Sequence, residues 1–310
     1  MRSLSRLIFV LIFAPLAACG SFTAGVEAPD LASDAARLES QVRIGETTRP
    51  QVHALLGEPL FANESWGVEL YRQEQSDVAT EWMVVLMVPV PGWTEVRDYR
   101  LYPLLVYESS GVVAGLAAGR YAEHHRGDGA FKSPEGTSAE VLGFTLAVDA
   151  CDEPACLWLV APADRSVSML RAPPAAGACV INIAKPENGL EIALDGQGLM
   201  SSSVSTCGAS DALPAEPWFA RITVSSGTHT VRATPTGPAL AIGGELVQTI
   251  DCRGDQLFVV RVLPEFRQPT SFFSRAQLTG EIQVLHSPDA VPADARLILF
   301  HGDRSLAPNH

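Results

Sequence analysis

The chain has 310 residues, of which 47% are hydrophobic, and it carries a formal net charge of −13. This length and hydrophobic content are typical of a globular protein of about two domains. The acidic balance argues against a nucleic-acid partner and against loose electrostatic adhesion to anionic lipid, because both need a basic surface.

The N-terminus has the form of a secretory signal. Arg2 and Arg6 precede an apolar stretch from Leu7 to Leu16, which is shorter than the roughly 20 residues that span a bilayer. It ends in Leu16-Ala17-Ala18-Cys19. This pattern resembles the lipobox of bacterial lipoproteins, and the resemblance implies that residues 1–18 are removed and that Cys19 is acylated, for example with palmitate. The alternative is an ordinary signal peptide with a chance cysteine at its end.

The residues around the cleavage point also bear on localisation. Gly20 follows Cys19, at the position where an Asp marks inner-membrane retention in enteric-type bacteria. The lipoprotein resemblance therefore implies attachment to outer-membrane lipid through Cys19, with the protein on the periplasmic face. Stable anchoring needs two or more acyl chains. Residues 19–29 are mostly small and polar, and we expect them to be a flexible tether.

Two short helices are predicted next. Apolar residues between Leu31 and Val42 recur at helical spacing, and Asp30 is placed to cap that helix. A second helix begins after Thr48, where Gln51 completes a capping box, and it ends at Gly57. Its apolar face is predicted to contain Val52, Leu55 and Leu56.

Extended segments follow these helices. Residues 66–73, 81–88 and 96–107 are rich in Val, Tyr and Trp, and a tight turn at 109–111 leads into 112–114. These segments predict an antiparallel meander. The apolar run from Trp82 to Trp93 contains two prolines, so we interpret it as a buried strand ending at a turn.

The segment from Ile44 to Pro59, with the hairpin that closes the meander, resembles the SmpA/OmlA (BamE-like) family of small lipoproteins of the outer-membrane β-barrel assembly machine. The resemblance implies an α+β domain over residues 30–117, with two short helices on a three-stranded antiparallel sheet. The first hairpin is longer here than in that family. The matching residues are Gly45, Thr47, Val52, Leu55, Gly57, Pro59, Tyr107, Gly111 and Val112.

Residues 118–178 are predicted to be a linker followed by short β hairpins. Residues 118–140 contain Gly, Pro and charged residues without periodicity, and 141–170 have the pattern of two or three strands. The adjacent pair His124-His125 is not expected to bind metal, because neighbouring side chains on a strand point apart.

From Cys179 onward the chain alternates apolar and polar residues between turns such as Asp195-Gly196. This predicts an all-β, sandwich-like domain over residues 179–310. Residues 179–262 resemble the PEGA-type β-sandwich module of bacterial surface proteins. The matching residues are Pro186, Glu187, Gly189, Leu194, Asp195, Gly196, Val224, Gly227, His229 and Val231.

Five cysteines remain if Cys19 is acylated, and an oxidising periplasm favours disulfides. Cys151 and Cys156 are close enough in sequence to staple a turn, and two of the other three are expected to pair, which leaves one odd thiol. A zinc site is less favoured, because Cys-x4-Cys has no second matching pair. The disulfide candidates are therefore Cys151, Cys156, Cys179, Cys207 and Cys252.

Familiar catalytic motifs are absent from the sequence: it has no Gly-x-Ser-x-Gly, no His-Glu-x-x-His and no phosphate-binding loop. We therefore predict no catalytic residue, no cofactor, no metal and no small-molecule substrate. Asp195 is expected to be a turn residue, and His229 to pack or form hydrogen bonds on a hairpin face. Trp66, Tyr71 and Trp82 are expected to pack in a core rather than to form a binding patch.

Together these patterns predict a non-enzymatic, lipid-anchored protein of the periplasm and outer membrane. It is expected to act in macromolecular interaction or envelope assembly, with a protein partner in the envelope. One alternative is a structural lipoprotein that binds peptidoglycan or another glycan through the β-sandwich. Another is an envelope hydrolase.

Overall fold

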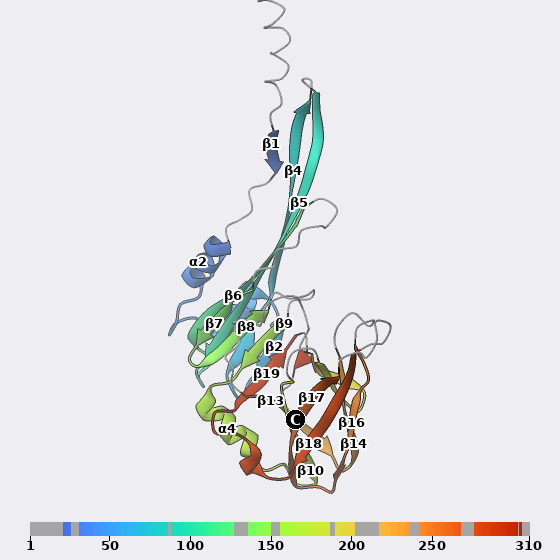
Figure 1. Ribbon diagram of the computed structural model, residues 1–310. Helices are drawn as coiled ribbons and strands as arrows, with labels where there is room; N and C mark the ends of the chain where they lie inside the picture. The colour runs from blue at the N-terminus through green and yellow to red at the C-terminus, as the bar shows by residue number, and fades with distance from the viewer. Residues whose placement is uncertain are drawn as a thin grey trace, which may run out of the picture.

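The computed structural model describes residues 21–25, 31–85, 88–126, 136–149, 156–186, 190–201, 217–235, 242–267, 276–302 and 304–305. These residues form three β-sheets, with few helices around them (Figure 1). The expected fold class is wrong, since the N-terminal part is not a small α+β domain with a three-stranded sheet, and the chain is mostly β. The α-helices of the described residues are α2 (Leu31–Gln41), α3 (Arg49–Leu56) and α4 (Ala163–Arg171).

The first sheet has six strands, ordered β1-β4-β5-β3-β2, with β6 on the other edge of β5. The local sequence pattern did not predict β1, because most of its residues are small and it lacks the Val, Ile and Tyr residues typical of strands. The strand is added through backbone hydrogen bonds that any sequence can form. β4 and β5 form a long hairpin that projects from the body (Figure 1). The strands are β1 (Ser21–Gly25), β2 (Phe61–Asn63), β3 (Val68–Leu70), β4 (Gln73–Val85), β5 (Val88–Tyr107) and β6 (Val113–Arg126).

Helices α2 and α3 lie where the sequence predicts them. The Thr48 amide donates to Gln51 Oε1 over 2.8 Å, so the capping box is confirmed. Val52 is fully buried, but Leu55 is 41% exposed, so its predicted place on the apolar face was wrong. The helices and one face of the first sheet share a small core of Leu38, Val42, Val52, Tyr71, Leu105, Tyr107 and Val113.

The second sheet has ten strands in the order β15-β18-β17-β10-β13-β19-β9-β8-β7, with β20 beside β19. It joins segments from both sides of the domain boundary expected at residue 178. Helix α4 covers the end of the segment 141–170, where only strands were expected, and continues to Arg171. The strands are β7 (Ser138–Val141), β8 (Phe144–Asp149), β9 (Cys156–Val160), β10 (Ala178–Ala184), β13 (Trp218–Ser225), β15 (Ile242–Gly243), β17 (Gln256–Arg267), β18 (Ala276–Leu285), β19 (Arg296–His301) and β20 (Arg304–Ser305).

A third sheet, ordered β12-β11-β14-β16, packs on one face of the ten-stranded sheet. Side chains alternate along each strand, so Trp158 and Val160 of β9 enter this core while Leu157 and Leu159 enter the core on the opposite face. The strands are β11 (Leu190–Leu194), β12 (Gln197–Ser201), β14 (Gly227–Pro235) and β16 (Leu246–Cys252).

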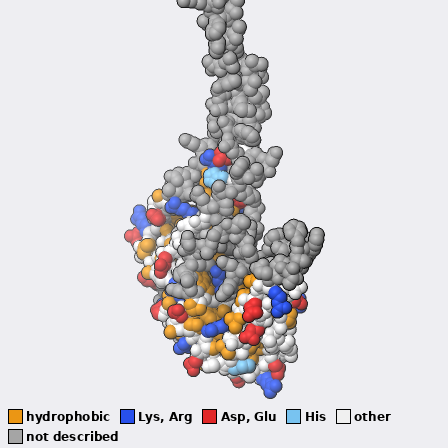
Figure 2. All heavy atoms as spheres, in the orientation of Figure 1, with side chains coloured by type: hydrophobic (Ala, Val, Ile, Leu, Met, Phe, Trp, Pro, Cys, Tyr) orange, Lys and Arg blue, Asp and Glu red, His pale blue; other side chains and the backbone are white. Residues whose placement is uncertain are grey.

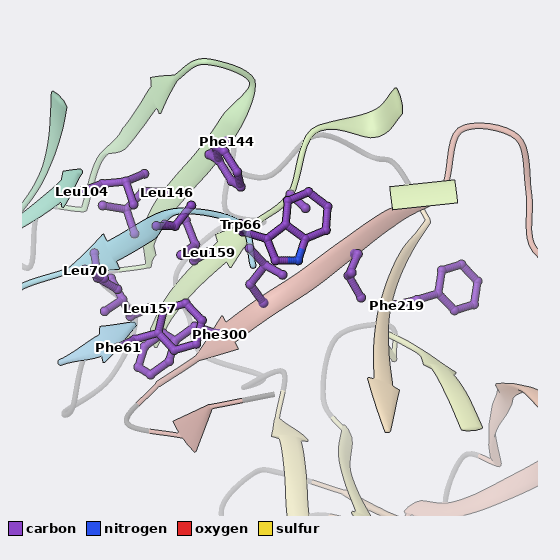
Figure 3. Packing of buried hydrophobic residues seen from close by; sticks show 14 of the residues in the cluster. Phe61, Trp66, Leu70, Leu104, Phe144, Leu146, Leu157, Leu159, Phe219 and Phe300 are labelled. Carbon is purple, nitrogen blue, oxygen red and sulfur yellow. The ribbon is translucent and has the colours of Figure 1, made fainter. Parts of the chain in front are cut away.

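The first sheet packs against the β7–β9 end of the ten-stranded sheet. Phe61 lies 5.4 Å from Phe300 and Trp66 lies 5.8 Å from Phe144, measured between ring centroids (Figure 3). The sheets approach so closely at Gly119 that a Cβ there would lie 2.9 Å from Leu146. One core therefore joins the two sheets, and the boundary expected at residue 117 falls inside β6. The expectation that Trp66 and Tyr71 pack in a core is confirmed, whereas the side chain of Trp82 lies outside the described residues.

Candidate functional site

A cavity of about 560 Å³ opens between the third sheet and the ten-stranded sheet. Its buried apolar surface comes from one residue on each of three strands, namely Ile250 of β16, Phe258 of β17 and Ile282 of β18. This volume lies within the usual range for ligand sites. The cavity is therefore a candidate binding site within the described part of the chain.

Polar groups form the rim of this cavity: Gln248, Thr249, Asp251, Arg253, Gln256 and His286. Arg253 Nε lies 3.0 Å from Asp251 Oδ2, and the Arg253 amide donates to Gln256 Oε1 over 2.9 Å. The His286 ring meets the Phe258 ring edge-on at 4.7 Å. An apolar floor below amide and charged groups suits a ligand with both apolar faces and hydrogen-bonding groups, such as a sugar or a peptide chain.

The disulfide between Cys179 and Cys252 fixes one end of the cavity. It joins β10 of the ten-stranded sheet to the last residue of β16 in the third sheet. The turn after β16 is held to the same place, because the Asp255 amide donates to the Ala178 carbonyl over 2.7 Å. The disulfide and this hydrogen bond therefore hold the two sheets together at the end of the cavity where Arg253 lies.

The other predicted cysteines have different outcomes. Cys156 is the first residue of β9, and nothing is described of its side chain. Cys19, Cys151 and Cys207 lie outside the described residues, so the acylation of Cys19 and a Cys151–Cys156 bond stay predictions.

Asp195 and His229 meet across the hairpins of the third sheet. Asp195 has a φ of 52° in the Asp195-Gly196 turn, as expected of a turn residue. His229 Nδ1 lies 2.7 Å from Asp195 Oδ2, and His229 Nε2 lies 2.8 Å from the Ser225 carbonyl oxygen. Both partners are acceptors, so both hydrogen bonds require the doubly protonated imidazolium. The hydrogen-bonding role expected of His229 is confirmed.

The electrostatics agree with that geometry. Burial lowers the pKa of His229, but the bonds to Asp195 and Ser225 outweigh burial and raise it above its ordinary value. Burial likewise raises the pKa of Asp195, but the bonds from His229 and the Thr230 amide hold it below its usual range. The pair therefore stabilises the fold fully at pH values between the ordinary pKa of Asp, about 4, and the ordinary pKa of His, about 6.5.

We expect the His229 contribution to be complete below about pH 6.5 and lost as the pH rises through the raised pKa. A His229→Gln variant should lose this part of the pH dependence of the free energy of unfolding, because glutamine does not titrate. Urea unfolding at pH 6 and pH 9 measures both proteins. An equally steep loss of stability in the variant over this interval would contradict the assignment.

A buried polar network lies between α3 and the first sheet. Glu69 Oε2 accepts from Tyr71 Oη over 2.6 Å and from Tyr107 Oη over 2.7 Å. His53 Nε2 lies 3.1 Å and Arg49 Nε 3.2 Å from Glu69 Oε1. Arg49 also stacks on the Tyr107 ring, with 4.7 Å between Cζ and the ring centroid.

The Glu69 network is suited to holding α3 on the sheet rather than to proton transfer. Burial raises the pKa of Glu69, but hydrogen bonds from Tyr71, Tyr107 and His53 outweigh it and lower that pKa. Burial and the bond to Glu69 raise the pKa of both tyrosines well above the ordinary value. A carboxylate kept ionised by this many donors is a poor base. Sequence reasoning missed Glu69, although a lone charge within the apolar run Val68–Tyr71 is a usable signal.

The remaining predicted features give no further site. His124 Nδ1 lies 3.5 Å from Glu95 Oε1 on the first sheet, and the side chain of His125 is outside the described residues. Among the residues described, no group of three His, Cys, Asp or Glu side chains is arranged to hold a metal ion. No described helix is both long enough and apolar enough to cross a membrane.

Comparisons with family models, with curated proteins and with solved structures give no match.

Proposed function

We propose that this chain is a non-enzymatic lipoprotein of the outer membrane that binds another macromolecule of the envelope. The observation that carries the proposal is the position of β1, two residues after Cys19 of the lipobox-like sequence. β1 pairs with the outer part of the β4–β5 hairpin. The strands β16, β17 and β18, which carry the cavity lining, lie in the body at the other end (Figure 1). An anchor at Cys19 would hold the cavity away from the lipid.

The surface chemistry agrees with a partner that is not bound through a basic face. Acidic and basic side chains are interspersed on the visible face of the described body, and hydrophobic side chains gather in its lower half (Figure 2). With a net charge of −13, electrostatic attraction to anionic polymers is weak. Recognition through a shaped, partly apolar cavity is the better-supported mode.

The experiment is crosslinking and affinity capture of the tagged protein from intact envelopes, with Cys19→Ala as the control. Mass spectrometry of the N-terminal peptide tests acylation in the same sample. Recovery of barrel-assembly components only with the acylated protein supports a role in envelope assembly. Absence of acylation, or the same recovery from both proteins, contradicts the anchored assembly role.

The second candidate is a protein that binds peptidoglycan, and the polar rim over an apolar floor favours it. We expect purified protein to co-sediment with peptidoglycan, and a Gln248→Ala/His286→Ala double variant to bind about tenfold more weakly. Gln283→Ala is the matched control, because it changes β18 at a residue outside the cavity lining. Equal binding by all three proteins would rule out recognition in this cavity.

A further inference from the structure

We propose that the outer end of the β4–β5 hairpin inserts into the same lipid leaflet as the acyl chains on Cys19. The inserting segments are Trp82–Val85 on β4 and Val88–Trp93 on β5, called the hairpin tip below. The inference rests on the proposed lipid anchor, and it adds a second, protein-made contact with the bilayer. Its partner is the hydrocarbon of a lipid leaflet.

The register of β1 brings the anchor to the hairpin tip. Ser21 is opposite Met83 and Gly25 is opposite Ala79, so the N-terminal end of β1 lies nearer the tip. Two peptide units separate Cys19 from Ser21, which limits their Cα atoms to a separation of about 7 Å. Acyl chains on Cys19 would therefore enter the leaflet beside the tip.

The sequence of the hairpin tip is that of a segment in contact with hydrocarbon. It contains no Asp, Glu, Lys or Arg, and Trp82 and Trp93 lie at its base on the two arms. The register places these tryptophans at nearly the same height, since Trp82 is opposite Pro91 and Thr80 is opposite Thr94. Tryptophan is enriched at the level of lipid headgroups, with apolar residues beyond it.

Charged groups begin directly below the tryptophans. Arg97 Nε lies 2.9 Å from Glu95 Oε1, and His124 of β6 approaches the same carboxylate oxygen. In the described part of the chain, the pairing of β5 with β6 ends at Glu95. From Glu95 to the tip, the only described strand beside the hairpin is β1, which pairs with β4. The charged side chains of Glu95 and Arg97 stay in water and set a limit to the depth of insertion.

The length of the tip fits one leaflet. Four residues from Trp82 to Val85 extend about 13 Å at the rise of a β-strand. Half of a hydrocarbon core is about 15 Å thick. The β4–β5 ladder would pair the backbone groups that face between the two arms, and β1 would pair those of Trp82 and Met83 on the other edge of β4. This pairing lowers the cost of placing a strand in hydrocarbon, and Pro89 and Pro91 have no N–H group that needs a partner. Because attachment here is apolar, it needs no basic surface.

Bromine quenching tests the proposal. The acylated full chain is reconstituted into phosphatidylcholine vesicles with or without brominated acyl chains, and tryptophan fluorescence is compared. Trp66, Trp158 and Trp218 are at most 9% exposed in the protein cores, so contact quenching should report on Trp82 and Trp93. We expect clear quenching of the wild type, its loss in Trp82→Phe/Trp93→Phe, and its retention in Trp66→Phe.

A matched pair of charge substitutions gives a second measurement. Val84→Asp places a charge in the hairpin tip, whereas Val78→Asp places the same charge on β4 below Glu95, at a residue that is 57% exposed. We expect Val84→Asp to reduce the inserted fraction about tenfold or more and Val78→Asp to leave it unchanged. Equal quenching in the two variants would overturn the proposal.

Failure of the anchor and failure of the tip are distinguishable in these samples. Mass spectrometry of the N-terminal peptide reports whether Cys19 is acylated, independently of fluorescence. An acylated protein without bromine quenching refutes hairpin insertion and leaves the anchor intact. Quenching that depends on Val84 in a protein without acylation refutes the anchor but supports a membrane-inserted hairpin tip.

Discussion

Replacing both Cys179 and Cys252 with alanine should lower the free energy of unfolding by about 4 kcal/mol. The bond closes a loop with a sequence separation of 73 residues, and in the chain-entropy account a loop of that length contributes this much by restricting the unfolded chain. Cys179 and Cys252 are buried, at 0% and 2% exposure, so the two alanines also lose the packing contacts that the sulfur atoms make in the core. The disulfide should therefore be among the largest single contributions to stability.

Urea unfolding of the wild type and the double variant measures the effect. The control is wild-type protein unfolded in the presence of reductant, which should have nearly the stability of the double variant. Reductant should not destabilise the double variant by this route, because it has no Cys179–Cys252 bond to reduce. If the cavity binds peptidoglycan, the variant should also bind it less well, because β16 is no longer joined covalently to β10. A loss smaller than about 1 kcal/mol, below the typical range for native disulfides, would contradict this account.

Glu69→Ala is the second large change, with an expected cost of about 3–5 kcal/mol. The substitution removes the acceptor of two buried tyrosine hydroxyls and the partner of His53 and Arg49. The hydroxyls of Tyr71 and Tyr107 would stay buried without that acceptor, and the contact between α3 and the sheet would weaken. We expect the helix to detach first, since the network forms much of its polar contact with β3 and β5.

Tyr71→Phe and Glu74→Ala are the matched variants for Glu69→Ala. Tyr71→Phe removes one hydrogen bond and should cost about 1–2 kcal/mol. Glu74 forms its ion pairs with Arg72 and Arg100 half exposed, so its loss should cost about 0.5 kcal/mol or less. Hydrogen exchange of α3, with thermal unfolding, measures all three proteins. Similar costs for Glu69→Ala and Glu74→Ala would contradict the role of the network.

Acid should reveal the same network. The lowered pKa of Glu69 means that its contribution is present above the ordinary pKa of a glutamate, about 4.3, and is lost as the pH falls through the lowered value. The destabilising effect of Glu69→Gln should therefore shrink in strong acid, where the wild-type carboxylate is itself protonated.

Local features of the fold followed from the sequence. Thr48 and Gln51 predicted the start of α3 because a capping box is completed within one helical turn. Asp195 and Gly196 predicted a turn because both residues tolerate a positive φ. Each depends on hydrogen bonds and backbone preferences among neighbours in the chain, so no distant residue was needed to predict it.

Which residues lie together in the cavity and in the Glu69 network could be learned only from the tertiary structure. The cavity combines β16, β17 and β18 from two sheets, and the Glu69 network gathers residues from α3, β3 and β5. The sequence determined that cysteines would pair, but only the position of β10 beside the end of β16 selected Cys179 and Cys252. β1 is the strongest case: its mostly small residues suggested a tether, while its pairing with β4 is made by backbone groups that every residue carries. Strand order depends on such nonlocal pairing, which has no signature in the local sequence.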